Sequence, residues 1–254
     1  MDNGLPLGVE VQEVIRETPS VSTIRFDHRF SFNPGQFVMV WVPGVDEVPM
    51  ALSSSNSITV QNVGAATSAL TAMHPGDLIG IRGPFGNGFE TREGTLAIAG
   101  GVGAAPLFPL AMSGVVRDFI IGAKTGSELL FVKPLGLVTR LHVLTDDGSA
   151  GKQGFAVRGM DDIEPGAYSQ VCVCGPEKMM AAVLRRLDEA GLAGRGRFSL
   201  HRYMKCGSGV CGSCCIDPGG LRVCRDGPVL PGDVLLESEF GRYTRDGSGV
   251  RKYM

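Results

Sequence analysis

The stretch Thr95–Met112, TLAIAGGVGAAPLFPLAM, indicates the fold class. It reads as a short apolar strand, a glycine turn at residues 100–103 and an apolar helix. This order turns backbone N–H groups and the positive end of a helix toward an anion. The stretch therefore predicts a strand-turn-helix unit that can hold a nucleotide phosphate. Because it lacks the full G-x-G-x-x-G fingerprint, an ordinary tight turn between a strand and a helix is the alternative.

A second unit of the same kind follows at Ser169–Gly191, SQVCVCGPEKMMAAVLRRLDEAG. Pro176 suits the first position of a helix, because proline lacks the N–H that would have no partner there. Strands and helices alternate over residues 93–197, which predicts a parallel α/β sheet. Ligands of such sheets bind at the carboxyl ends of the strands, where both glycine turns fall. The candidate nucleotide-binding residues are Gly100, Gly101, Gly103, Ala104, Cys174, Gly175, Pro176 and Met179.

Residues 1–92 have a different pattern. Short β-rich runs such as STIRFDH and DLIGIRGP are separated by Pro-Gly, Gly and Asn turns. Six or so short strands with turn signals predict a small antiparallel barrel. The chain is 43% hydrophobic and 20% charged with a net charge of -2, which indicates a globular protein and does not favour nucleic-acid binding. The sequence has no secretory signal and no apolar run long enough to span a membrane, so we expect a cytoplasmic protein.

Five of the seven cysteines lie within Tyr203–Cys224, YMKCGSGVCGSCCIDPGGLRVC. Four of them have the spacing C-x4-C-x2-C-x9-C, which begins like that of plant-type 2Fe-2S ferredoxins. The intervening glycines permit positive φ and a close approach of backbone N–H groups to sulfur. A zinc site and reactive thiols are the alternatives, but structural zinc sites usually present two short cysteine pairs. The predicted ligands of a 2Fe-2S cluster are Cys206, Cys211, Cys214 and Cys224.

The other cysteines are predicted to lie outside the ligand set. Cys215 is adjacent to a ligand, so its side chain should point elsewhere, while Cys172 and Cys174 alternate along a strand and suit a protein core. Four basic residues near the cluster segment either moderate the negative charge of a thiolate-bound cluster or form a basic docking surface. These residues are Arg202, Lys205, Arg222 and Arg225.

Seven motifs occur in an order that matches a known family. They are PGQFVMVWVPG, VPMALSS, GAAT, HPGDLIGIRGPFGNGF, GGVGAAPL with LTDDGSAGKQGF, CGPEKMM, and CGSGVCGSCC with VCRDGPV. Over almost its whole length the chain resembles the ferredoxin-reductase superfamily and, within it, the electron-transfer subunits of NAD-linked dihydroorotate dehydrogenases. The resemblance implies a FAD-binding β-barrel over 1–92, an NAD-binding α/β domain over 93–197 and a cluster-binding domain over 198–254.

The resemblance also implies a flavin site on the barrel. The chain departs from the family pattern in three places: Val48 replaces an arginine, Ala51 a serine and Ala66 a glycine. The arginine would contact the flavin phosphate, a charged hydrogen bond of about 1.5–3 kcal/mol. FAD is still expected, because backbone groups make up much of such a site. The alternatives are loss of flavin binding and binding of a shorter flavin. The implied contacts are Val48, Pro49, Met50, Ala51, Leu52, Ser53, Thr59, Val60, Gln61, Gly64, Ala66 and Thr67.

The function that the resemblance implies is an electron relay in pyrimidine biosynthesis. A partner subunit would oxidise dihydroorotate on FMN, and electrons would pass through the cluster and FAD to NAD+, in a heterotetramer. No catalytic residue is assigned to this chain, because none of its four scattered histidines lies in a motif for a base. The alternatives are a diaphorase-like subunit of a hydrogenase or sulfide dehydrogenase, and a flavin-free iron-sulfur relay module. Residues 237–254 are either part of the partner interface or disordered.

Overall fold

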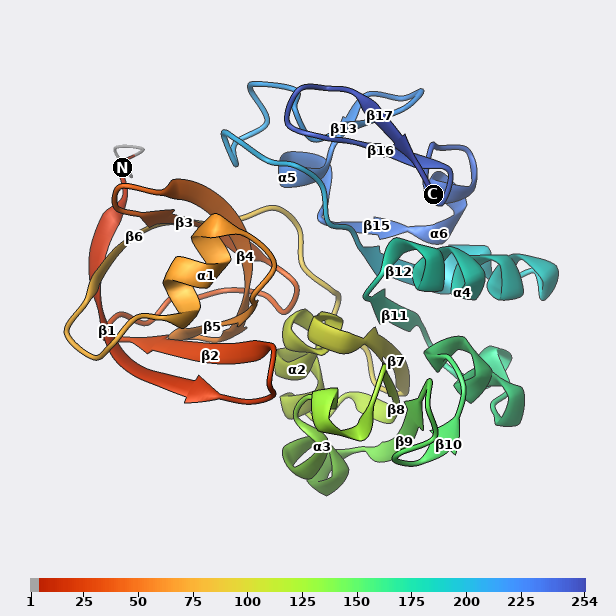
Figure 1. Cartoon of the computed structure of the whole chain (residues 1–254). Coiled ribbons are helices and arrows are strands. Elements are labelled where there is room, and N and C mark those ends of the chain that lie inside the picture. Colours follow the sequence, from red (N-terminus) through yellow and green to blue (C-terminus); the bar gives the residue numbers. More distant parts are fainter. Residues whose placement is uncertain (1–4) are drawn as a thin grey trace.

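The computed structural model describes residues 5–254. Within them the chain forms a closed barrel of six strands and a sheet of seven strands, followed by a C-terminal segment of short hairpins and helices (Figure 1). The barrel order is β1-β2-β5-β4-β3-β6, and every neighbouring pair is antiparallel. The strands are β1 (Leu7–Arg16), β2 (Val21–Phe26), β3 (Phe37–Val42), β4 (Asp46–Ser54), β5 (Ser57–Gln61) and β6 (Leu78–Phe85).

Alternation of apolar residues fills the barrel interior. Ile24, Leu52 and Ile58 are fully buried there, from β2, β4 and β5. The short helix α1 (Ala65–Thr71) packs against this core through Leu70, which is also fully buried. The predicted antiparallel barrel is therefore confirmed, and its outer surface on β4 and β5 is left for contacts with the rest of the chain.

The second sheet has the order β10-β9-β8-β7-β11-β12-β15. All neighbouring strands are parallel except β15, which runs antiparallel to β12. The strands are β7 (Thr95–Gly100), β8 (Val116–Ala123), β9 (Arg140–Thr145), β10 (Lys152–Gln153), β11 (Val171–Cys174), β12 (Gly196–Ser199) and β15 (Val229–Pro231). The parallel α/β sheet predicted from the glycine turns is confirmed.

Helices cover both faces of this sheet. On one face α2 (Ala104–Met112) and α3 (Val132–Val138) bury Leu107 and Leu135 against β7 and β8. On the other face α4 (Glu177–Glu189) buries the residues that recur at helical spacing, Val183 and Leu187 among them. Helix α2 also contacts β4, so the barrel and the sheet meet along this helix. Short 3-10 turns complete the domain at 101–103, 126–128, 156–162, 165–167 and 193–195.

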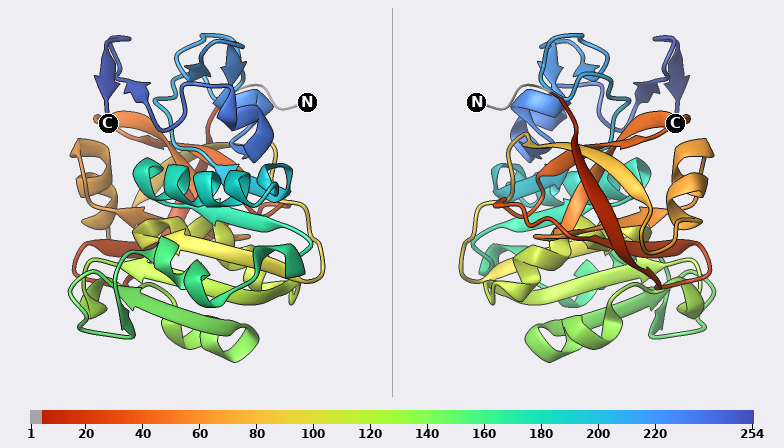
Figure 2. Two further views of the ribbon diagram at one scale, coloured as in Figure 1. Left: turned by 90° about the vertical axis from the view of Figure 1, so that its right-hand side faces the viewer. Right: turned by 90° about the vertical axis from the view of Figure 1, so that its left-hand side faces the viewer.

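The C-terminal segment lies at the opposite end of the molecule from α3 (Figure 2). It contains β13 (Cys215–Ile216), β14 (Leu221–Arg222), α5 (Val223–Asp226), α6 (Gly232–Leu236), β16 (Tyr243–Arg245) and β17 (Arg251–Tyr253). The tail forms the hairpin β16–β17, with Tyr243 opposite Tyr253, so it is ordered. Between these elements β15 returns to the edge of the seven-stranded sheet. No helix within residues 5–254 is long and apolar enough to cross a membrane.

Candidate cofactor sites

The structure brings the two glycine turns together at one edge of the sheet. Ala99 and Cys174 are register partners on the parallel strands β7 and β11, so the turns that follow them lie side by side. A Cβ on Gly103 would lie 2.3 Å from the Cys174 carbonyl oxygen, and one on Gly100 would lie 2.7 Å from Met179 Sδ. Glycine is therefore required for close packing of the turns, and all of the predicted nucleotide-binding residues gather at this edge.

Strand β12 adds residues to this edge that the sequence did not single out. Ser199 is the register partner of Cys174, and burial raises the pKa of the half-buried Cys174 thiol to about 12 despite a hydrogen bond with Ser199. His201 follows two residues later. Its side chain is exposed, yet burial lowers its pKa, as does Arg202, against an opposing effect of Glu177.

The predicted flavin residues lie on two neighbouring strands, with Leu52 on β4 opposite Ile58 on β5. Leu52 and Val60 point into the barrel core and are fully buried, so only their backbones can touch a ligand. The predicted residues Val48, Pro49, Met50 and Ala51 are half-buried on β4, and Val48 and Met50 pack against the barrel core.

The hydroxyl groups among the predicted flavin residues already bond to one another. Thr59 Oγ1 donates to Ser53 Oγ at 2.9 Å, and Ser53 Oγ is 3.0 Å from Ser57 Oγ. Thr23 extends this chain, 2.9 Å from Thr59. All four residues are buried. The side chains of Ser53 and Thr59 thus stabilise the join between β2, β4 and β5, which the sequence could not reveal.

The GAAT motif forms the start of α1. The backbone N–H groups of Val63 and Gly64 donate to Thr67 Oγ1 at 2.9 Å, and this hydroxyl donates to the Gly64 carbonyl, also at 2.9 Å. Ala66 lies inside the helix, where alanine is the most favourable residue, so replacing the family glycine does not disturb the turn. Gln61 ends β5 just before this turn.

The cluster segment folds as the glycine pattern predicts. Gly207, Gly209 and Gly212 have φ values of 70°, 81° and 75°, a region that disfavours other residues. Their turns direct N–H groups at three of the four sulfurs. Gly209 N donates to Cys224 Sγ at 3.1 Å, Val210 N to Cys206 Sγ at 3.3 Å and Cys224 N to Cys214 Sγ at 3.4 Å. Donors aimed at sulfur stabilise thiolates, the form that binds a cluster.

The thiols are arranged in two pairs. Cys206 interacts with Cys211, and Cys224 interacts with Cys214. Burial alone would raise the pKa of Cys206, but N–H groups from Cys211, Ser208 and Val210 outweigh it and lower the pKa to about 6. Among residues 5–254 no group of three or more ligand side chains converges on a single ion position. Four cysteines with N–H donors aimed at three of their sulfurs are a donor set that fits an iron-sulfur cluster.

The cluster segment sits on the barrel face formed by β3 and β6. Arg82 Nη1 donates to the Cys206 carbonyl at 3.3 Å, and a Cβ on Gly207 would lie 2.8 Å from Met39 Cγ. Cys215 lies on β13, half-buried, and burial raises the pKa of its thiol. The neighbouring thiols of Cys214 and Cys211 also raise this pKa.

Three of the four basic residues near the cluster form ion pairs with acids. Arg202 is buried and forms a two-pronged ion pair with Glu177 at the start of α4. The side chain of Lys205 lies 3.7 Å from Asp46, and that of Arg222 lies 3.3 Å from Asp226. Arg202 and Arg222 therefore hold parts of the chain together, whereas Lys205 and Asp46 form a half-exposed pair at the surface.

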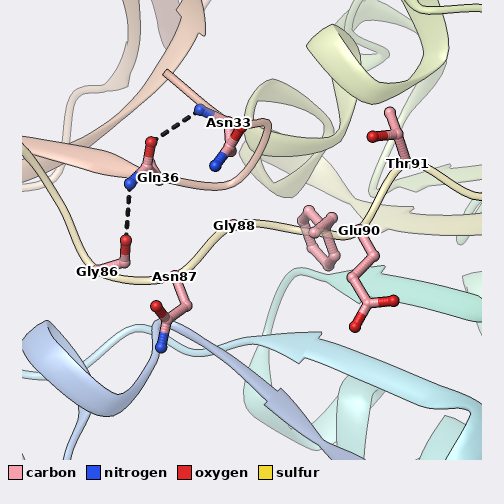
Figure 3. A pocket seen from close by; sticks show the side chains of 8 residues that line it. Asn33, Gln36, Gly86, Asn87, Gly88, Glu90 and Thr91 are labelled. Carbon is pink, nitrogen blue, oxygen red and sulfur yellow. Dashed lines mark hydrogen bonds between the residues drawn. The ribbon is translucent and has the colours of Figure 1, made fainter. Parts of the chain in front are cut away.

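A polar hollow of about 560 Å³ lies apart from all of these residues. It is formed by the barrel loop 33–36 and by the connection 86–91 between barrel and sheet (Figure 3). Gln36 Nε2 donates to the Gly86 carbonyl at 2.7 Å, and Asn87 N donates to the Gly227 carbonyl at 2.6 Å. These two hydrogen bonds join residues 86–91 to the barrel and to the cluster segment. The hollow therefore lies where the barrel, this connecting segment and the cluster segment meet.

Solved structures share this architecture. A structure of an NADH-dependent reduced ferredoxin-NADP oxidoreductase, from work on flavin-based electron bifurcation, matches with a TM-score of 0.80 and 25% identity, over 91% of this chain and 90% of that chain. The flavohem-like FAD/NAD binding domain of nitric oxide dioxygenase from Vibrio cholerae matches with a TM-score of 0.67 and 22% identity, over 76% and 98%. The fold is that of the ferredoxin-reductase-like flavoproteins.

Sequence relatives narrow the class. Residues 201–236 match the family model for the iron-sulfur cluster binding domain of dihydroorotate dehydrogenase B. A probable dihydroorotate dehydrogenase B (NAD(+)) electron transfer subunit from Methanocella arvoryzae is 51% identical, over 97% of this chain and 98% of the relative. The corresponding protein of Methanocaldococcus jannaschii is 44% identical, over 98% of both. The chain belongs to the family of dihydroorotate dehydrogenase B electron transfer subunits.

Proposed function

We propose that the chain is the electron-transfer subunit of an NAD-linked dihydroorotate dehydrogenase and acts as an oxidoreductase subunit in pyrimidine biosynthesis. Electrons from an FMN-bearing catalytic partner would pass through a 2Fe-2S cluster and FAD to NAD+. The observation that carries this proposal is the set of backbone N–H groups aimed at the paired cysteines, on a chain whose barrel and sheet have the flavoprotein fold.

We assign the cluster to Cys206, Cys211, Cys214 and Cys224, and the FAD to β4, β5 and the start of α1. A bound FAD exchanges single electrons with the cluster and a hydride with the nicotinamide. On β4, Pro49 and Ala51 would contact the flavin through side chains, while Val48, Met50, Leu52, Val60 and the paired hydroxyls would contribute backbone groups. The turn at 100–103 and the start of α2 would direct N–H groups at the NAD phosphates.

The residues that would oxidise dihydroorotate are assigned to the partner. That reaction needs a base beside a flavin and a pocket for a carboxylate. His142 is hydrogen bonded to Asp118 at 2.7 Å toward the amino ends of β8 and β9, away from the glycine turns, and His28 packs on Phe30. We also propose the division 1–92, 93–197 and 198–254 as functional domains, with β15 of the last completing the sheet of the second. The complex would be a cytoplasmic heterotetramer.

Purification and cofactor analysis test this function directly. We expect two irons, two sulfides and one extractable FAD per chain. NADH should reduce an artificial acceptor in the presence of the chain alone, whereas NAD-linked oxidation of dihydroorotate should require the catalytic subunit. Turnover of dihydroorotate by the isolated chain, or stoichiometric zinc in place of iron, would refute the assignment. A chain that retains iron but binds no flavin after reconstitution would favour the iron-sulfur relay module.

A further inference from the structure

One peptide group in the cluster loop connects a guanidinium to a cysteine sulfur. The amide between Gly209 and Val210 accepts a hydrogen bond at its carbonyl from Arg222 Nη1, at 3.2 Å. The N–H of the same amide donates to Cys206 Sγ at 3.3 Å. A cation on the carbonyl side polarises the amide and makes its N–H a stronger donor to the sulfur.

The preceding amide serves the other cysteine pair. Gly209 N donates to Cys224 Sγ at 3.1 Å, so Gly209 lies between donors to both pairs. Because Gly209 has φ of +81° and is buried, its orientation is fixed by its surroundings. A Cβ there would lie 2.7 Å from Arg225 Cδ, which places the Arg225 side chain against the glycine.

Arg222 is itself held in place. Its own backbone N donates to Asp226 Oδ2 at 2.8 Å, and its Nε lies 3.3 Å from the same oxygen. Asn87 Nδ2 donates to the Asp226 carbonyl at 3.2 Å, which ties this group to the connection between barrel and sheet. The Arg222 side chain is about one-third exposed, and its N–H groups donate to the Gly209 carbonyl in the cluster loop and to Asp226.

We infer that Arg222 is a positioning residue for the cluster: it holds and polarises the Gly209–Val210 amide so that the hydrogen bond from Val210 N to Cys206 favours the reduced cluster. This inference rests on the proposed function, since it needs the cluster at these cysteines. Hydrogen bonds to cluster sulfurs are one of the means by which a protein sets the reduction potential. The structure thus assigns Arg222 a role in how readily the chain accepts an electron from its partner.

The test is an EPR-monitored redox titration of the purified, cluster-loaded protein. For Arg222→Gln we expect the reduction equilibrium to become about tenfold less favourable, equivalent to about 59 mV for a one-electron couple. Arg222→Lys retains a cationic donor and should stay within about threefold of the wild type. Arg225→Gln removes the same formal charge beside the same glycine and serves as the matched control, with a shift of about threefold or less.

The outcomes separate the inference from the function beneath it. Iron-loaded Arg222→Gln protein with an unchanged midpoint, or with the same shift as Arg225→Gln, overturns the inference while leaving the relay function intact. If Arg222→Gln does not retain iron, the midpoint potential of Arg222→Lys becomes the test. A large shift of that midpoint would overturn the inference, because Arg222→Lys keeps a cationic donor. Wild-type protein without two irons refutes the proposed function itself.

Discussion

Replacing Arg202 with methionine should destabilise the whole protein. The Arg202 side chain is 3% exposed and forms a two-pronged ion pair with Glu177, of which the Nη2–Oε1 distance is 3.0 Å. Its Nε lies 3.6 Å from Oε1 of Glu239, whose side chain is 1% exposed. Arg202 therefore joins the start of α4, the segment before the tail hairpin and the chain that enters the cluster loop.

The magnitude follows from the groups left behind. Removing one member of a buried ion pair typically costs about 3–5 kcal/mol, because the remaining charge is buried without its partner. Here the carboxylates keep other donors: Gly241 N donates to Glu177 Oε1 at 2.9 Å, and Asp217 N donates to Glu239 Oε2 at 2.9 Å. We therefore expect about 3 kcal/mol, which corresponds to a fall in melting temperature of roughly 6–12 °C for a chain of this size.

Thermal unfolding followed by circular dichroism measures this effect. Arg25→Met is the control, because the exposed Arg25–Glu13 pair should contribute about 0–1 kcal/mol. Adding Glu177→Gln to Arg202→Met should be less damaging than the sum of the single changes, since the unpaired buried charge is then removed. A melting temperature for Arg202→Met no lower than that of Arg25→Met would show that the ion pair contributes little.

Three further predictions concern single residues. Cys211→Ser should lower iron below two per chain and bleach the visible spectrum, while Cys215→Ser should leave both unchanged by metal analysis and absorbance. Gly103→Ala should raise the KM for NADH at least tenfold with unchanged flavin content, because its Cβ would lie 2.3 Å from a carbonyl oxygen; Gly8→Ala, with nothing within 4 Å, is the control. Burial opposes ionisation of Asp118, but hydrogen bonds from His142 and Tyr168 outweigh it and lower the pKa of this carboxyl. The ionised Asp118 carboxylate therefore stabilises the fold above the unfolded pKa of about 3.9, and this stabilisation is lost as pH falls. Asp118→Asn should lower the urea midpoint at pH 7, and the midpoint of this variant should decline less steeply in acid than that of the wild type.

The features that could be predicted from the sequence are those that depend on residues close together in the chain. Strand alternation, glycine turns and cysteine spacing are local patterns, so the barrel, the parallel sheet and the paired thiols could be anticipated. Strand β15 could not, because Val229–Pro231 is too short to show a period and its partner β12 is distant in the chain. The ion pair of Arg202 with Glu177 could not be predicted either, because its two residues are also distant in the chain. Nothing near Arg202 in sequence indicates that an acid at the start of α4 will neutralise it.

The barrel explains how cofactors with different chemistry can be held at fixed separation. The cluster segment rests on β3 and β6, through Met39 and Arg82. The proposed flavin residues lie on β4, the strand that pairs with β3 on its other side. Adjacent strands are about 4.8 Å apart, so the proposed cluster and flavin sites would be on neighbouring strands of one rigid barrel.

The nucleotide edge also meets the barrel at β4, because α2 starts at the glycine turn and contacts this strand. Strand β4 is then the element shared by the proposed flavin site and the nucleotide edge, and it pairs with β3, on which the cluster segment rests. Its side chains can vary, as Val48 and Ala51 do, provided that its position between β3 and β5 is kept. We therefore expect flavin binding at β4 to depend on backbone contacts more than on a charged side chain at position 48.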